Sequence, residues 1–252
     1  MVSRCFRVCW PRADLPPNPR LSTIPTAPPP KRHPYDQWSP DARALDLVGD
    51  KWTLLIIRDL AAGPRRFVEL QRVLPGISTE QLRSRLNRMV ADGLLTRQRY
   101  REVPPRVDYE LTERSRDLMP VLGALADWGY DWTWTAPRPG EEVNIGAIFR
   151  LAPGLLSPTA GLEGTVELVV SGEDSEDDRA YRLTIGDGRV AIAERDLEGE
   201  PDARVSGHVS AWVQALGPEG ATDELQITGA GALAEGLLRG FTHAAQRTAA
   251  AA

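Results

Sequence analysis

The chain has 252 residues, of which 42% are hydrophobic and 26% charged, and a formal net charge of -5. This composition is typical of a soluble globular protein, and the length suits one large domain or two ordinary ones. The sequence has no apolar run of about eighteen residues and no secretory leader pattern, so we expect a cytoplasmic protein without a membrane span. Its only cysteines, Cys5 and Cys9, exclude a disulfide framework, and we expect no metal site.

The charge is unevenly distributed along the chain. Residues 63–106 contain ten Arg and four acidic residues, a net charge of +6, whereas residues 138–252 contain nine Arg and nineteen acidic residues, a net charge of -10. A basic block followed by an acidic block predicts two modules with different partners. The basic block is a candidate surface for a polyanion, and the acidic block is a poor one.

The first 34 residues contain nine Pro and end in APPPKRHP. They show neither helical nor strand periodicity, and such a segment has too little apolar surface to fold. We predict a disordered arm, or a start codon assigned too far upstream.

Residues 39–76 predict three short helices. Ser39 and Asp50 have side chains suited to cap the first two, and a glycine follows each of them as a stop signal. A third helix from about residue 65 would turn Phe67 and its apolar partners inward. A turn containing Pro and Gly then leads into a fourth helix, which predicts a helix-turn-helix unit.

The fourth helix, residues 78–93, has one apolar face and a polar remainder. Its apolar residues recur with helical spacing: Leu82, Leu86, Met89 and Val90. Ser78 and Gln81 form a capping box at its start. Three Arg mixed with Gln, Ser and Asn can contact phosphates and base edges in a major groove. A surface helix with merely solvated charges is the alternative.

A basic β-hairpin follows directly. Two β-leaning runs, 95–101 and 106–111, flank Glu102-Val103-Pro104-Pro105, and they carry several Arg. A basic hairpin that directly follows the second helix of a helix-turn-helix is typical of a winged-helix domain. The alternative is an edge strand that its charges protect against aggregation.

Thr112 opens a further helix that ends in an aromatic cluster. Three Trp and Tyr130 lie within residues 128–134, more than a small domain can bury by itself. A partner subunit is the natural cover. Packing against the second half of the chain is the alternative.

The segments ALDLVGDKWTLLIIRDL, GPRRFVELQRVLPGIST and VDYELT make the first half similar to the HxlR family of bacterial winged-helix transcriptional regulators, over about Tyr35 to Trp132. The resemblance implies a homodimer in which each subunit places its recognition helix in a major groove and its wing near the minor groove. It implies DNA contacts by a set of polar and basic residues: Arg65, Arg66, Ser78, Thr79, Gln81, Ser84, Arg85, Arg88, Arg97, Arg99 and Arg106. Arg85 has the alternative of pairing with an acidic neighbour.

One position departs from the family pattern. Many members have Cys just before the Pro of the first helix, where this chain has Ser39. A hydroxyl has no thiolate chemistry, so we expect no thiol-based sensing.

The acidic half follows a linker predicted at 136–140. Short helices and alternating runs indicate an α+β domain with an antiparallel sheet. Strands are predicted at 165–171, 180–185, 189–193 and 225–229, and helices near 143–151, 205–216 and 230–241. Gly186-Asp187-Gly188 is typical of a hairpin turn.

The order of these elements and the late block ITGAGALAEGLLRGF resemble the sterol-carrier-protein-2-like family over about residues 141–241. The resemblance implies an apolar tunnel for a small hydrophobic ligand. Its possible wall residues are Phe149, Leu168, Trp212, Leu233 and Leu237. The alternative is that the same residues fill a closed core.

The predicted fold is a mainly α winged helix-turn-helix domain followed by a C-terminal α+β domain with an antiparallel sheet. The predicted segments are a disordered arm (1–34), the winged-helix domain (35–135), the linker (136–140), the sterol-carrier-protein-2-like domain (141–245) and a disordered tail (246–252).

No catalytic pattern accompanies the three histidines His33, His208 and His243, and we find no phosphate-binding glycine loop. The acidic loop at 173–178 lacks the glycine and the distal Glu of an EF-hand loop. We therefore expect no enzyme, no metal and no cofactor. The sequence favours a homodimeric regulator that binds double-stranded DNA and senses a small hydrophobic molecule. The alternative is a lipid or acyl-chain carrier that uses the winged helix as a dimerisation scaffold, which the ten-Arg block disfavours.

Overall fold

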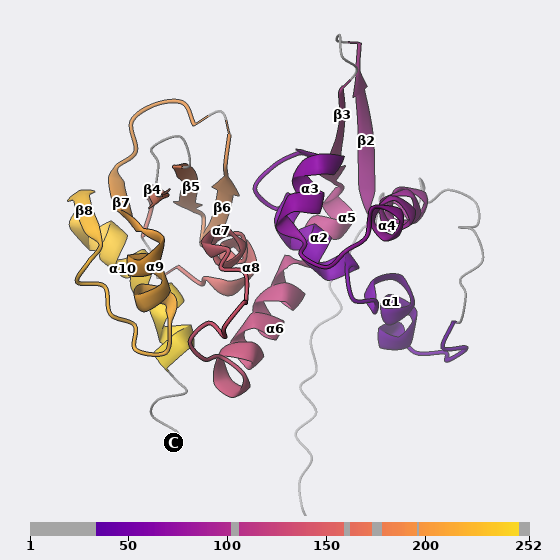
Figure 1. The fold of residues 1–252 in the computed structure, drawn as a ribbon, viewed down its shortest axis with the longest axis horizontal. Coiled ribbons are helices and arrows are strands. Elements are labelled where there is room, and N and C mark those ends of the chain that lie inside the picture. The colour runs from indigo at the N-terminus through magenta and orange to yellow at the C-terminus, as the bar shows by residue number, and fades with distance from the viewer. Residues whose placement is uncertain (1–33, 102–105, 159–161, 173–177, 196, 247–252) are drawn as a thin grey trace, which may run out of the picture.

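A computed structural model describes residues 34–101, 106–158, 162–172, 178–195 and 197–246 of the chain. The first half forms a winged-helix module with the predicted helices and hairpin in order (Figure 1). The start of the third helix is wrong, because Arg65 and Arg66 form a short strand that pairs with the hairpin, and the helix begins at Phe67. The elements of this module are α1 (Pro40–Val48), α2 (Thr53–Leu60), β1 (Arg65–Arg66), α3 (Phe67–Val73), α4 (Thr79–Ala91), β2 (Leu95–Tyr100), β3 (Arg106–Leu111), α5 (Glu113–Arg116) and α6 (Met119–Trp132). The three strands pair antiparallel in the order β1-β3-β2.

The predicted helix caps are present. Ser39 Oγ accepts a hydrogen bond from the backbone N–H of Ala42 at 3.4 Å, and Asp50 Oδ1 accepts one from Trp52 at 2.9 Å. At the start of α4, Ser78 Oγ accepts from the N–H of Gln81, whose Oε1 accepts from the N–H of Ser78, both at 3.1 Å. Each cap satisfies a backbone donor that the helix leaves without a partner, so local sequence fixes where these helices begin.

The single helix predicted from Thr112 is wrong in one respect, because it is broken between α5 and α6. Pro120 in the first turn of α6 has no N–H, so it cannot donate to the carbonyl of Arg116 as a continuous helix requires. The break redirects α6 toward the second half of the chain.

The second half forms a C-terminal module of helices and one five-stranded sheet. Its elements are α7 (Ile145–Phe149), α8 (Ala152–Leu155), β4 (Gly164–Ser171), β5 (Arg179–Gly186), β6 (Arg189–Ala193), β7 (Ala203–His208), α9 (Val209–Leu216), β8 (Gln226–Gly229) and α10 (Gly231–Gln246). The strand order is β6-β5-β4-β7-β8.

This sheet corrects two predictions. The antiparallel sheet is wrong for one pairing, since β4 and β7 run parallel while the other three pairings are antiparallel. The helix predicted over 205–216 begins only at Val209, because residues 203–208 form strand β7, which lies between β4 and β8. Val205 lies beside Leu168 of β4, and both are fully buried, so burial against the helices overrides the helical pattern.

Each module has its own apolar core, and the two cores meet where α6 crosses α8. Met119 and Leu122 of α6 belong to the core of the winged-helix module, and Phe149 and Trp212 to that of the C-terminal module. At the crossing, a Cβ placed on Gly123 would lie 2.0 Å from the carbonyl oxygen of Gly154. Only glycine allows the two backbones to approach this closely.

The sheet of the C-terminal module lies on the far side of α2 and α3 from α4, and the β2–β3 hairpin projects away from both modules (Figure 1). The structure therefore leaves α4 and the hairpin on a side that the acidic half does not occupy. In the part of the chain that the structure describes, no helix combines the length and the apolar character needed to cross a membrane.

Several predictions lie outside the described residues. They concern the arm at 1–33 with its two cysteines, the hairpin tip at 102–105, most of the acidic loop at 173–178 and the tail after Gln246. The predicted domain boundaries and the linker at 136–140 remain predictions.

Candidate nucleic-acid interface

Helix α4 buries one face and exposes a polar one, as the apolar spacing predicts. Leu82, Leu86 and Met89 are buried in the core of the winged-helix module. The exposed side chains of the helix and its cap are almost all polar: Ser78, Thr79, Glu80, Gln81, Arg83, Ser84 and Asn87. A helix face with this composition can read base edges and contact phosphates.

The N-terminal end of α4 is held firmly in place. Besides the reciprocal bonds between Ser78 and Gln81, Thr79 Oγ1 accepts a hydrogen bond from Gln71 Nε2 of α3 at 2.8 Å. The bond ties α4 to the preceding helix of the pair. The partial positive charge of a helix N-terminus adds to the attraction for phosphate here.

Two of the predicted DNA contacts on α4 have structural partners instead. Arg85 pairs with Asp50 at 3.1 Å, which is the alternative that the sequence left open. Arg88 pairs with the buried Asp92 at 3.0 Å, one turn further along the helix. Both Arg side chains lie mostly against the protein. Arg85 joins α4 to the residue that caps α2, whereas Arg88 pairs with the C-cap of α4 itself.

Two residues of the exposed face are absent from the DNA contacts predicted from the sequence. The side chain of Arg83 is 63% exposed and forms a loose ion pair with Glu80 at 3.7 Å. Asn87 lies one turn further along on the same exposed side. Their spacing of four, offset from the Leu82–Leu86 stripe, was the signal that could have identified them.

The hairpin presents a second basic surface beside α4. Arg97 and Arg99 are exposed on β2, and the guanidinium of Arg97 lies 6.0 Å from the ring centre of Tyr109. Arg106 on β3 is less available, because it binds Asp108 through two nitrogens at 2.8 and 2.6 Å. Arg97 and Arg99 of β2 are therefore the wing arginines most accessible to a phosphate.

Arg65 is the clearest error among the predicted DNA contacts. It is buried, its Nε donates to the backbone carbonyl of Asp59 at 2.8 Å, and its guanidinium pairs with Glu194 of the C-terminal module. Burial and the neighbouring charge of Arg150 lower the pKa of Arg65. Its neighbour Arg66 points the other way, with its Nε 3.9 Å from Asp108 and half of its side chain exposed.

The partner of Arg65 belongs to a buried ion network between the modules. Arg150, which has no exposed surface, contacts Asp59 at 3.4 Å, Glu194 at 2.9 Å and the hydroxyl of Tyr181 at 3.3 Å. Burial alone would raise the pKa of Glu194, but Arg150 and Arg65 outweigh it and hold that pKa below its usual value. The network fixes α2 and β1 to the C-terminal sheet.

The five predicted ligand-wall residues are buried in the core of the C-terminal module. Phe149 packs edge-on against Trp212 at a ring separation of 4.8 Å, and Leu168 is fully buried in the same core. Leu233 and Leu237 are buried too, although Leu237 also borders a hollow of about 360 Å³ on the outside. The closed-core alternative therefore describes these five residues.

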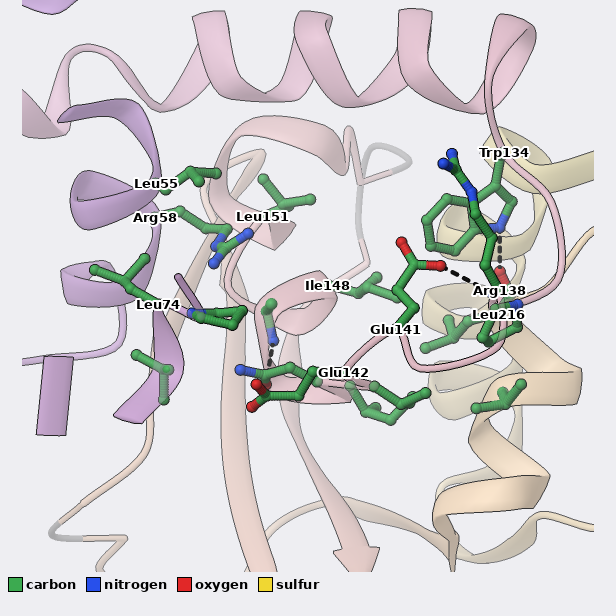
Figure 2. A pocket seen from close by; sticks show the side chains of 18 of the residues that line it. Leu55, Arg58, Leu74, Trp134, Arg138, Glu141, Glu142, Ile148, Leu151 and Leu216 are labelled. Carbon is green, nitrogen blue, oxygen red and sulfur yellow. Dashed lines mark hydrogen bonds between the residues drawn. The ribbon is translucent and has the colours of Figure 1, made fainter. Parts of the chain in front are cut away.

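A cavity of about 500 Å³ lies instead between the two modules (Figure 2). Its walls come from α2, the end of α3, the segment after α6, α7 and α9. Its apolar lining includes Trp52, Leu55, Leu74, Trp134, Ile148 and Leu216. Charged side chains of both signs stand around it, among them Arg58, Arg138, Glu141 and Glu142.

Comparison with known proteins gives matches to the first half of the chain. The HxlR-like helix-turn-helix family matches residues 47–136. An uncharacterised HTH-type transcriptional regulator of Synechocystis sp. is 43% identical over 93 residues, which cover 37% of this chain and 69% of that protein. One of Halalkalibacterium halodurans is 43% identical over 94 residues, covering 37% of this chain and 83% of that protein. One of Mycobacterium tuberculosis is 46% identical over 104 residues, covering 41% and 63%.

Among solved structures, the redox regulator HypR in its oxidised form is 36% identical, with a TM-score of 0.35. The match covers 36% of this chain and 94% of that one. The C-terminal module lies beyond residue 136, where the family match ends.

Proposed function

This chain belongs to the HxlR-like helix-turn-helix family and is a transcriptional regulator of that type, and from this premise we propose that it binds duplex DNA as a homodimer through α4 and the β2–β3 hairpin. The observation that carries the proposal is the exposed polar face of α4 beside the exposed arginines of β2, on the side away from the acidic C-terminal module.

In this proposal the two surfaces have different tasks. The face of α4 enters a major groove, where Arg83 and Asn87 have the side chains that bind guanine and adenine edges. The sugar-phosphate backbone of the DNA is contacted near the start of α4 by Ser78, Thr79, Gln81 and Ser84. Arg97 and Arg99 of the hairpin neutralise phosphates, and Arg66 is placed to do the same. Arg85 and Arg88 act indirectly, Arg85 by tying α4 to Asp50 and Arg88 by stabilising the end of α4 through Asp92.

A second copy of the chain is the proposed cover for an exposed apolar stripe on α6. Its members are spaced by four, three and four residues and keep about half or more of their surface: Val121 (49%), Leu125 (53%), Trp128 (56%) and Trp132 (74%). Aromatic residues on a helix face are typical of the core of a subunit interface. A two-fold dimer would place two α4 helices at half-sites about 34–36 Å apart.

We further propose that the C-terminal module regulates DNA binding in response to a small apolar molecule. Its likeness to sterol-carrier-protein-2-like domains is part of this proposal. The buried network through Asp59, Arg150 and Glu194 supports it, because a change in the position of the sheet must be transmitted to α2. A pure lipid carrier would leave the basic surface of α4 and β2 without a role.

The test is selection of bound duplexes from a random DNA library, followed by fluorescence anisotropy on the selected sequence. We expect a two-fold symmetric site, and an affinity that falls steeply as salt rises from 50 to 200 mM, the pattern produced by about six or more phosphate contacts. Arg189→Ala, in the hairpin of the acidic module, is the matched control for substitutions of Arg97 and Arg99. The proposal would be contradicted if no sequence is enriched and the chain binds DNA no more strongly than an unrelated acidic protein does.

A further inference from the structure

We propose that the cavity between the two modules binds an uncharged, apolar small molecule that contains a ring, and that this occupant changes the position of α4. The binding site stands on its own geometry. The effect on DNA rests on the proposed function. None of the five ligand-wall residues predicted from the sequence lines this cavity, and the proposed DNA-binding surface lies outside it.

The cavity has the size and lining of a ligand site. Its volume of about 500 Å³ lies inside the range of about 300–1,000 Å³ that is usual for drug-sized ligands. Two tryptophans line it, Trp52 at the start of α2 and Trp134 after α6, and Leu55, Ile148 and Leu216 supply aliphatic surface (Figure 2). A lining that combines flat aromatic rings with aliphatic side chains favours a ring-containing ligand.

Positive and negative side chains nearly balance around the cavity, which is why we assign an uncharged occupant. Arg58 pairs with the buried Asp59 at 2.9 Å. Glu141 accepts a hydrogen bond from the backbone N–H of Arg138 at 2.9 Å, and Lys51 lies 4.7 Å from the ring centre of Trp52. Lys51 and Arg138 stand against Glu141 and Glu142, so the lining has only a small net charge to offset the desolvation of an ionic ligand.

The cavity also borders the segment that positions α4. Leu74 and Pro75, which end α3 and open the turn, are lining residues, and the N–H of Ile77 donates to the carbonyl of Leu74 at 3.3 Å. Ser78, the cap of α4, follows directly. A molecule that pushes against Leu74 therefore acts on the turn from which α4 starts.

The other wall of the cavity belongs to the C-terminal module. Ile148, Val213 and Leu216 line it there, so one molecule would touch both modules at once. A further hollow of about 570 Å³, bordered by Arg65, Glu194 and Arg195, lies along the same interface. The ion network of Arg150, Asp59 and Glu194 joins the two modules beside this second hollow, so an occupant of the first cavity acts on modules that are coupled to each other.

The first experiment uses N-phenyl-1-naphthylamine, an uncharged aromatic probe whose fluorescence rises in apolar surroundings, with the full chain. We expect saturable binding with energy transfer from tryptophan. Val213→Trp and Leu55→Trp add bulk from opposite walls, and each should weaken binding at least tenfold. Val68→Trp is the matched control, because Val68 is 55% exposed on α3 and does not line the cavity. Circular dichroism melts confirm that the variants are folded.

The outcomes separate the site from its consequence. Unchanged binding in both filling variants, or no saturable binding to the wild-type chain, would overturn the site. Equal or tighter binding of the anionic analogue 8-anilinonaphthalene-1-sulfonate would overturn the uncharged class.

A second experiment measures DNA affinity with and without the neutral probe. We expect a change of about fivefold or more, and the same factor in probe affinity when DNA is added, because coupling is reciprocal. A probe that binds at the cavity and leaves DNA affinity unchanged would overturn the coupling alone. A chain that binds the probe but no DNA would contradict the proposed function and leave the binding site supported.

Discussion

Arg150 and Asp59 form an ion pair at full burial, with Nη1 3.4 Å from Oδ1, although 91 positions separate them in the sequence. Glu194 completes the site with a contact of 2.9 Å to Arg150. A buried charge is tolerated only when it is paired and hydrogen-bonded. Since no other arrangement of the modules would bring these three residues together, we infer that the network selects the orientation in which the interface forms.

Asp59→Ala should destabilise the fold by about 3–5 kcal/mol, because it leaves the buried guanidinium of Arg150 with less compensation. Urea unfolding followed by circular dichroism measures this loss. The control is Glu110→Ala, which breaks the pair with Arg116 at 3.1 Å, where both side chains are more than a third exposed. That variant should lose about 1 kcal/mol or less. Equal losses in the two variants would show that the buried network contributes nothing special.

Glu194 predicts a definite dependence of stability on pH. Arg150 and Arg65 outweigh burial and hold its pKa below the usual value of 4.5, so folding favours its charged form. The contribution is therefore fully present above about pH 4.5 and is lost as pH falls through the lower pKa of the folded state. The unfolding free energies of the wild-type chain and Glu194→Gln should differ by a constant amount between pH 5 and 7 and converge in acid. A difference that grows as the pH falls would contradict this assignment.

The residues that local sequence could place are those whose partners lie within one turn of helix. The caps at Ser39, Asp50 and Ser78 follow from neighbours two or three positions away. The burial of Leu82 follows from spacing alone. These features depend on short-range geometry, which the order of residues states directly.

The residues that sequence misplaced depend on contacts far along the chain. Arg65 is attached to a residue 129 positions later, and nothing near it in sequence indicates that partner. Val205 is predicted in a helix but lies in a strand. Its parallel neighbour Leu168 is 37 positions earlier in the chain, so local sequence does not indicate the pairing. The apolar character of Trp212 was correctly read as buried, but whether a core is closed or hollow depends on how rings such as Phe149 meet, which periodicity does not specify.

The two arginines of β2 should behave differently from Arg65 in DNA binding. Arg97→Ala and Arg99→Ala should each weaken binding to all sequences and reduce the slope of log affinity against log salt by about 0.9. Arg65→Ala should lower stability and leave that slope unchanged, because its guanidinium faces Glu194. Anisotropy titrations at several salt concentrations measure the slopes. A loss of slope in Arg65→Ala equal to that in Arg97→Ala would place Arg65 at the DNA after all.

Sequence discrimination should depend on the exposed face of α4. Asn87→Ala and Arg83→Ala should each reduce the preference for the selected site over a mismatched one by about 1–3 kcal/mol. Their effect on non-specific binding should be small for Asn87, which carries no charge. Competition titrations with single-base variants of the selected site measure both quantities. If neither substitution changes the ranking of the variants, the groove is read by other residues.

Dimer formation should depend on the stripe along α6. Leu125→Asp and Trp128→Asp introduce a charge at the centre of this face and should give a monomer, measured by size-exclusion chromatography with light scattering. Val68→Asp is the control, because Val68 is similarly exposed at 55% but lies on α3. A wild-type chain that is already monomeric at micromolar concentration, or an aspartate variant that remains dimeric, would require a different cover for this face.

The crossing of α6 over α8 should tolerate no side chain at Gly123. A Cβ there would lie 2.0 Å from the carbonyl oxygen of Gly154, and both partners are backbone, so neither can move aside without shifting a helix. Gly123→Ala should therefore destabilise the chain by about 1–3 kcal/mol or more, as overpacking does. Gly129→Ala is the matched control on the same helix, because its nearest contact would be Thr133 Oγ1 at 3.8 Å. Alanine favours the helix by up to about 1 kcal/mol there, so the two substitutions should shift the unfolding midpoint in opposite directions, and a shared direction would mean that the crossing is not closely packed.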